Sequence, residues 1–243
     1  MHTLVEKFEH EIVEANESRV GEAKSKSENI RIADCPSDIS KGKLLAIVFK
    51  YDVAPKYKLA RPELDMRINT LLDDKPIMLY EESFCSGVRF PLSEPLRSFF
   101  NEYEITINQL HPNGLRLLCG IVELGRRNRT TLTARRMGEL YCFYHRVNED
   151  HCFLQVKNDC NIFYKAVKIS SLKNWKQKYF IVHRAGGFSI PNQWSSDPMR
   201  RLPTSPTLED QKCVDLIKAR GLRSVNLKQV IAKGYRVLPL AGL

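Results

Sequence analysis

Apolar residues recur at helical spacing in the middle of the chain and at alternating spacing after it. Two helical runs lie between residues 96 and 122. The first consists of Leu96, Phe99, Phe100 and Tyr103, and the second of Leu115, Leu118, Cys119 and Val122. A spacing of three and four residues places side chains on one helical face. Pro95 and Pro112 are typical of a first helical turn. The pattern therefore predicts two helices joined by a tight corner.

The segments before this pair predict shorter elements. Pro76–Tyr80 is expected to form a strand that leads into a short helix at Glu81–Cys85, which Gly87 ends. Ser40 is a suitable cap for a helix over Leu44–Phe49, although a strand fits that short apolar run equally well. Prolines at 55 and 62 indicate a loop over residues 53–63, because proline restricts itself and the residue before it.

The period changes from helical to alternating after residue 144. Thr131–Thr133 offers a cap for a helix with Met137, Leu140, Tyr141 and Tyr144 on one face. Cys152–Val156 and Ile162–Val167 are expected to pair around a turn, and Tyr179–Val182 is a third strand. The prediction is an α+β fold, mainly helical, with a small antiparallel sheet in the second half of the central domain.

Composition changes along the chain indicate four regions. Residues 1–35 form a polar arm, helical or disordered, in which Leu4, Phe8, Ile12 and Val13 make a short apolar stripe. Residues 36–75 form a lead-in of helix and loop, and residues 76–190 the main domain. Residues 191–243 form a linker and short helices, expected at 208–220 and 226–233, each stopped by a glycine.

The formal net charge of +10 is unevenly distributed, and this suggests a polyanionic partner. Residues 1–30 carry seven Glu against four Lys or Arg, whereas residues 116–136 carry six Arg against Glu123 alone. Clustered cations suit phosphate contacts with RNA or DNA, but they are equally typical of a solvated surface. The candidate nucleic-acid-binding residues are Arg126, Arg127, Arg129, Arg135, Arg136, Lys173, Lys176 and Lys178. Trp175 and Tyr179 lie among the lysines, either as base-stacking rings or, as we favour for Trp175, as core residues.

Candidate catalytic and metal-binding residues are sparse, and we expect no enzyme, cofactor or small-molecule substrate. The seven scattered cysteines are interpreted as small buried side chains. Cys142, His145, His151, Cys152 and Cys160 have ligand chemistry for zinc, but a core role suffices for Cys142 on a predicted helix. Asp73 and Asp74 pair two carboxylates suitable for Mg²⁺, yet precede Lys75-Pro76 and favour a turn.

Several short motifs together resemble the gypsy-type transposon domain of plant retroelement proteins, over about residues 76–190. They are Phe84 and Gly87 with Phe90-Pro91-Leu92, then Leu110-His-Pro112-Asn113, then Trp175-Lys176 with Tyr179-Phe180-Ile-Val182. The chain departs from the family pattern at residues 148–151, where a longer glycine- and tryptophan-bearing loop is expected. The resemblance implies a Gag-like or accessory protein of a long-terminal-repeat element, without catalytic residues.

These observations predict a non-enzymatic, Gag-like protein that associates with nucleic acid through its basic clusters. The alternative is a self-assembly or protein-interaction module, in which the acidic arm meets the basic centre of a neighbouring copy. The sequence contains no run of 18 apolar residues and its first residues do not resemble a secretory signal. The expected location is therefore the nucleus or cytoplasm, without a membrane partner.

Overall fold

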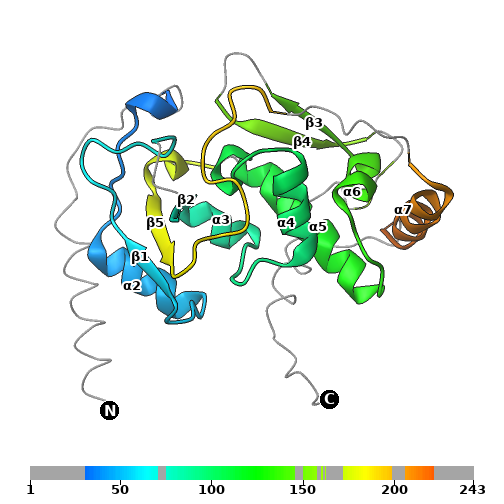
Figure 1. Cartoon of the computed structure of the whole chain (residues 1–243), viewed down its shortest axis with the longest axis horizontal. Helices are drawn as coiled ribbons and strands as arrows, with labels where there is room; N and C mark the ends of the chain where they lie inside the picture. Colours follow the sequence, from blue (N-terminus) through cyan, green and yellow to red (C-terminus); the bar gives the residue numbers. More distant parts are fainter. Residues whose placement is uncertain are drawn as a thin grey trace, which may run out of the picture.

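The computed structural model describes residues 31–70, 75–145, 150–157, 160, 162, 172–198 and 206–221. Within them the chain has the α+β fold that the sequence predicts (Figure 1). Several predictions lie outside the described residues: most of the polar arm, the Asp73–Asp74 pair, nearly all of the 162–167 strand and the 226–233 helix.

A three-stranded antiparallel sheet organises one end of the molecule. Its central strand is β5 (Tyr179–Arg184), which pairs with β1 (Tyr57–Ala60) on one side and β2 (Ile77–Tyr80) on the other. The predicted strands at 76–80 and 179–182 are confirmed. The predicted loop over residues 53–63 is wrong, because β1 lies within it. Pro55 and Pro62 bound this edge strand without removing a hydrogen-bond donor from its ladder.

Alternation along β2 and β5 divides the interior into two hydrophobic clusters. Leu79 and Phe180 face the main cluster, which also receives side chains from the helices. Tyr80 and Tyr179 face a smaller cluster that contains Trp175. Trp175 is only 8% exposed, so the preferred core interpretation is confirmed. Period-two alternation of side chains across a strand places the two sets on opposite faces of the sheet.

The helices on the main cluster begin at or near the residues that the sequence predicts. They are α2 (Lys41–Lys50), α3 (Glu81–Ser86), α4 (Glu94–Glu102), α5 (Pro112–Arg127), α6 (Ala134–Leu140) and α7 (Leu208–Gly221). The hydroxyl of Ser40 accepts a hydrogen bond from the Lys43 amide and so caps α2. Residues 44–49, for which the sequence allowed either a helix or a strand, are therefore helical. Three short helices complete the described elements: η2 (Ile32–Asp34) precedes α2, η3 (Ile107–Gln109) lies between α4 and α5, and η4 (Trp175–Gln177) directly precedes β5.

A second, two-stranded sheet packs near α5, and one of its strands replaces part of a predicted helix. The helix expected to continue to Tyr144 ends at Leu140, and residues Tyr141–His145 form β3 instead. Strand β4 (Cys152–Val156) pairs with β3, and Phe143 lies opposite Leu154. The expected pairing of this strand with residues 162–167 stays a prediction, because nearly all of that segment lies outside the described residues. Aromatic side chains favour a strand, and Tyr141 and Phe143 are buried while Cys142 between them is exposed.

Side chains from both sides of residue 75 belong to the main cluster. Ile47 of α2, Leu118 of α5 and Ile217 of α7 are all members.

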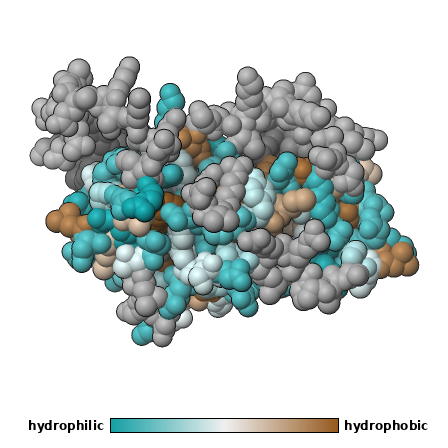
Figure 2. All heavy atoms as spheres, turned by 90° about the horizontal axis from the view of Figure 1, so that it is seen from above, coloured by the Kyte–Doolittle hydropathy of each residue, from teal (hydrophilic) through white to brown (hydrophobic). Residues whose placement is uncertain are grey.

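On the face shown in Figure 2, hydrophobic colour is confined to small separate patches among hydrophilic residues. Among the helices described, none is long and apolar enough to cross a membrane.

Candidate functional site

A surface pocket of about 610 Å³ lies where the end of α2, the loop 87–93 and the second half of α5 meet. We call it the basic pocket, because its lining includes three cations, two carboxylates and two aromatic rings: Lys50, Arg89, Arg126, Asp52, Glu123, Tyr51 and Phe90. The other lining residues are Ala54, Gly87, Pro91, Ser93, Leu96, Cys119 and Val122. This volume is sufficient for one nucleotide-sized ligand.

The end of α3 determines the direction in which the loop 87–93 continues, along the wall of the pocket. The amide of Gly87 donates to the carbonyl of Phe84 (3.1 Å), and the amide of Val88 donates to the carbonyl of Ser83 (3.0 Å). These are the two hydrogen bonds of a Schellman cap. Gly87 has φ 119°, a left-handed value that glycine adopts without steric cost. The chain therefore leaves the helix at an angle that places Arg89 and Phe90 in the pocket.

Arg89 is fixed at this helix end by its own hydrogen bonds. Its Nη1 donates to the carbonyls of Phe84 (2.7 Å) and Val88 (2.6 Å). Its guanidinium also lies over the ring of Tyr51, 4.6 Å from the centroid. Carbonyls at a helix C-terminus attract a cation, and the ring face adds a cation–π contact. Arg89 is therefore a pre-positioned charge in the wall.

Other aromatic rings pack against Tyr51 and Phe90, the two rings of the pocket wall. Phe90 stacks on Tyr57 with centroids 4.8 Å apart, and Tyr51 stacks on Phe84 at 5.2 Å. The Tyr51 hydroxyl lies 3.0 Å from the Cys85 sulfur. Burial, and then this contact, raise the pKa of Tyr51, so its phenol is neutral at physiological pH. The two pocket rings are thus firmly packed and uncharged.

On the α5 side, one carboxylate orients two of the predicted arginines. Glu123 accepts hydrogen bonds from Arg126 Nε (2.7 Å) and Nη2 (2.8 Å) and from Arg127 Nε (2.7 Å). Burial acts to raise the pKa of Glu123, but the hydrogen bonds from the two arginines outweigh it and lower the pKa. The Arg126 side chain remains 58% exposed. It therefore combines a fixed orientation with access to solvent.

Cys119 lies in the floor of the pocket and is chemically inert there. Burial raises the pKa of its thiol to about 12. The thiolate, not the thiol, is the nucleophilic form of cysteine. Cys119 therefore contributes to the floor of the pocket as a small apolar side chain.

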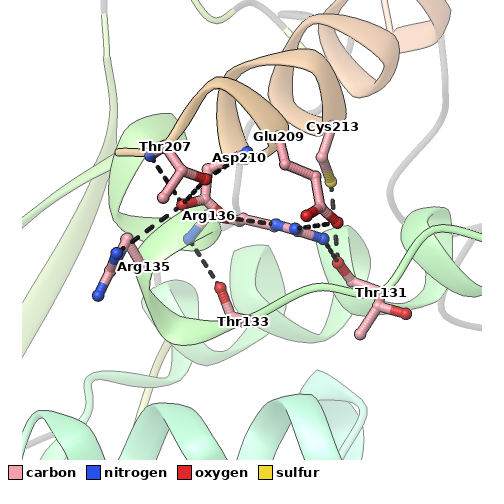
Figure 3. A network of polar contacts seen from close by, with 8 residues as sticks. All are labelled: Thr131, Thr133, Arg135, Arg136, Thr207, Glu209, Asp210 and Cys213. Atoms are coloured by element: carbon pink, nitrogen blue, oxygen red, sulfur yellow. Dashed lines mark hydrogen bonds and ion pairs between the residues drawn. The ribbon is translucent and has the colours of Figure 1, made fainter. Parts of the chain in front are cut away.

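Two other predicted arginines, Arg135 and Arg136, do not line this pocket but lie in a contact between α6 and α7 (Figure 3). Arg136 Nε donates to Asp210 Oδ1 (2.8 Å), and its Nη2 lies 3.1 Å from Glu209 Oε1. Arg135 lies 3.9 Å from Asp210. These residues were predicted to bind phosphate. In the structure their charges face carboxylates of α7 and hold that helix in place.

The remaining predicted cations lie at separate places. Lys178 forms an ion pair with Asp38 (2.8 Å), and Lys173 is exposed next to η4. Lys176 lies within η4 and is half-buried. Arg129 follows the end of α5, is exposed and has φ 52°. The cations that are clustered in sequence are thus divided among the pocket, the α6–α7 contact and the η4 region.

The family motif residues are mainly structural. Phe84, Leu110, Trp175 and Phe180 are buried core residues. Gly87 caps α3, and the peptide bond between Phe90 and Pro91 is cis. Leu92 packs against the main cluster, and Pro112 is the first residue of α5. Asn113 donates its amide to His111 Nδ1 (3.1 Å), so the histidine caps this helix. Gly87, Phe90 and Pro91 also line the basic pocket.

Sequence reasoning missed several polar or aromatic residues of the pocket, among them Lys50, Tyr51, Arg89 and Glu123. Lys50-Tyr51 places a cation next to an aromatic ring at the end of a predicted helix, and this pair could have indicated a binding residue. Arg89 lies inside the Gly87–Leu92 motif and was passed over as part of a structural element. Glu123 was the single acid among the arginines, and it orients two of them.

The zinc candidates are not brought together in the described part of the chain, where no group of three His, Cys, Asp or Glu side chains has metal-binding proximity. Cys142 was expected on a buried helix, but it is exposed on β3. All seven cysteines are free thiols. Cys85 is half-buried and the other five are buried, as expected.

His151 is a buried titratable residue in an aromatic setting. Its Nε2 lies 3.3 Å from the Tyr80 hydroxyl, and its ring contacts those of Trp175, Trp194 and His111. Burial, and then the neighbouring His111, Lys176 and His145, lower the pKa of His151 well below its usual value. The folded protein therefore holds this imidazole neutral.

We expect the folded state to lose stability as pH falls below about 6.5, because an unfolded histidine binds a proton there and His151 does not. The loss from this group approaches about 1.4 kcal/mol per pH unit until the pKa of the folded state is reached. Urea unfolding at pH 7.5, 6.5 and 5.5 measures it. His151→Phe should make the dependence shallower, and an unchanged slope in that variant would contradict the assignment.

Comparisons with known proteins identify no relative. No family model, no curated protein and no solved structure matches this chain.

Proposed function

We propose that this chain is a non-enzymatic, Gag-like protein of the plant retroelement type that associates with single-stranded nucleic acid through the basic pocket. The observation that carries the proposal is the combination of Lys50, Arg89 and Arg126 with the rings of Tyr51 and Phe90 in one pocket of about 610 Å³. Proteins that bind single strands combine cations for the backbone with aromatic rings for the bases.

We assign separate roles to the side chains of the pocket. Lys50 is exposed and Arg126 is largely so, which suits contacts with backbone phosphates. Phe90 offers a ring surface for one base. The Tyr51 ring, which stacks on Phe84 and lies against the Arg89 guanidinium, forms the adjoining wall. A base must be unstacked from its neighbours to enter such a pocket, so single strands should bind better than duplexes.

The titration state of the pocket supports a binding role without catalysis. The Cys119 thiol is protonated at physiological pH, and the Glu123 carboxylate is occupied by two arginines. Neither group is poised as a nucleophile or general base. A role in packaging element nucleic acid, in the nucleus or cytoplasm, follows from the family resemblance and this binding mode.

The test is fluorescence anisotropy with labelled single-stranded RNA and duplex DNA over a range of salt concentrations. We expect Lys50→Gln/Arg126→Gln to weaken single-strand binding about tenfold and to reduce the salt slope by about 1.4, or about 0.7 for each lost phosphate contact. The control is Lys58→Gln/Lys212→Gln, which removes the same charge from exposed positions on β1 and α7.

An unchanged salt slope in the pocket variant, or a loss equal to that of the control, would refute the pocket as the binding site. Absence of binding by the wild-type chain at low salt would refute the function. Light scattering on the same samples then tests the competing function, self-association, through a mass that rises with protein concentration.

A further inference from the structure

Helix α2 exposes an apolar face to solvent. The side chain of Phe49 is 82% exposed and that of Leu45 is 49% exposed, one turn apart. The small residues Gly42 and Ala46 lie beside them on the same side of the helix and are also exposed. No atom lies within 4 Å of the position that a Gly42 Cβ would take. We call these four residues the α2 face. It offers large apolar anchors next to small residues that permit a close approach.

The charges around the α2 face select an acidic partner. Helical geometry places Lys41 and Lys50 on opposite sides of the face. Lys43 lies on the same side of the helix as Lys50, two turns earlier, and pairs with Glu81 (2.9 Å). The helix itself, Lys41–Lys50, contains no acidic residue. Two copies packed through this face would bring lysines against lysines, which is unfavourable. An apolar segment flanked by carboxylates fits better.

The first residues of this chain have that chemistry in their sequence. Leu4, Phe8 and Ile12 follow one another at intervals of four residues, the spacing of one helical face. On a helix, Glu9 and Glu11 would lie on opposite sides of this stripe. Residues 1–30 carry seven Glu against four Lys or Arg. The stripe and its flanking acids therefore match the anchors and flanking lysines of the α2 face.

We propose that residues 1–16 dock on the α2 face of the same molecule. The connecting residues 17–30 span up to about 46 Å when extended, at about 3.3 Å per residue. A ten-residue helix such as α2 is only about 15 Å long. The reach is thus ample, and a short linker gives an effective concentration in the millimolar range, which favours the arm of the same chain over that of a second copy.

Hydrogen–deuterium exchange on the full chain tests this docking through the arm amides. We expect Phe49→Ser, which changes α2 and not the arm, to increase the amide exchange of arm residues 4–13 about tenfold. We expect Phe8→Ser, which changes the arm itself, to have the same effect. The control is Leu64→Ser, which alters an apolar side chain of similar exposure, 87%, outside α2. All three substitutions leave the net charge unchanged.

Arm protection that is lost in Phe49→Ser, kept in Leu64→Ser and independent of protein concentration supports docking within one molecule. Equal arm exchange in wild type and Phe49→Ser overturns it. Protection that appears only together with a dimeric mass in light scattering also overturns it, because the occupant would then be a second copy.

Docking of residues 1–16 on the α2 face would also affect the basic pocket, because Lys50 borders both the α2 face and the pocket. This consequence rests on the proposed function. An arm carboxylate next to Lys50 competes with a phosphate, so Phe8→Ser should bind single-stranded RNA more tightly than wild type, by about tenfold at low salt. If the chain binds no nucleic acid, the exchange result still decides the docking.

Discussion

Phe84→Ala is expected to lower the free energy of unfolding by about 3–5 kcal/mol, the usual cost of removing a buried phenyl ring. The side chain is 1% exposed. It stacks on Phe180 of β5 with centroids 6.0 Å apart and on Tyr51 at 5.2 Å, and it meets Phe90 edge-on at 5.9 Å. The ring therefore joins the three-stranded sheet to the wall of the basic pocket.

Chemical denaturation monitored by circular dichroism measures this loss. Phe49→Ala is the matched control, because it removes the same ring from a position that is 82% exposed and should cost less than about 1 kcal/mol. If the two variants unfold at the same denaturant concentration, the central position assigned to Phe84 is wrong. Nucleic-acid binding by Phe84→Ala, measured where the variant is folded, reports separately on the pocket wall.

The helical part of the fold was predictable because its signals are local. Gly87 ends α3, Pro112 begins α5 and Thr133 caps α6, each at or next to the expected residue. Such capping and turn preferences depend on a few neighbouring residues. In α4 and α5 the spacing of apolar residues agreed with these capping signals, so both kinds of signal indicated the same helices.

The sheets were predicted less well because strand pairing is not local. Strand β5 pairs with β1 and β2, which both lie about a hundred residues or more earlier in the chain. The 141–145 segment fits a helical stripe when considered alone. It becomes a strand because β4 provides a hydrogen-bonded partner and the helices provide contacts for its buried residues. Phe143 packs against Tyr103 at the end of α4, with ring centroids 4.8 Å apart, and the Tyr141 hydroxyl donates to the Leu117 carbonyl of α5.

The candidate site was predicted only in part for the same reason. Arg126 was found from its charge, but the residues that form a pocket with it come from α2 and the 87–93 loop. Conversely, Arg135 and Arg136 belong to the same sequence cluster and contact α7, more than seventy residues later. Charge density along a chain does not reveal which cations face carboxylates.

Asp210→Ala is expected to release α7 from the rest of the fold and to cost about 2–4 kcal/mol, through the loss of a helix cap and of a buried ionic partner. The amide of Thr207 donates to Asp210 Oδ2 (2.9 Å), and the amide of Asp210 donates to Thr207 Oγ1 (3.1 Å). This reciprocal pair is a capping box. The same carboxylate accepts from Arg136, and the side chains of the two residues are only 9% and 12% exposed.

Glu209→Ala is the matched control, because Glu209 contacts the same Arg136 but its side chain is 85% exposed. Exposed ion pairs contribute little, so its effect should stay below about 0.5–1 kcal/mol. Hydrogen–deuterium exchange of residues 208–219 measures the release of α7 directly. Equal exchange in the two variants would mean that the apolar contacts of Val214 and Ile217 hold this helix without Asp210.

Acid titration provides an independent measurement of the same contact. Hydrogen bonds from the Thr207 amide, and then from Arg136, lower the pKa of Asp210 to about 2. The unfolded carboxyl has a pKa of about 3.9, so the stabilisation is complete above about pH 4 and declines as pH falls toward 2. In wild type, α7 exchange corrected for its intrinsic pH dependence should therefore rise over that interval. In Asp210→Ala that rise should disappear, because the titrating group is gone while Arg136 keeps its charge throughout.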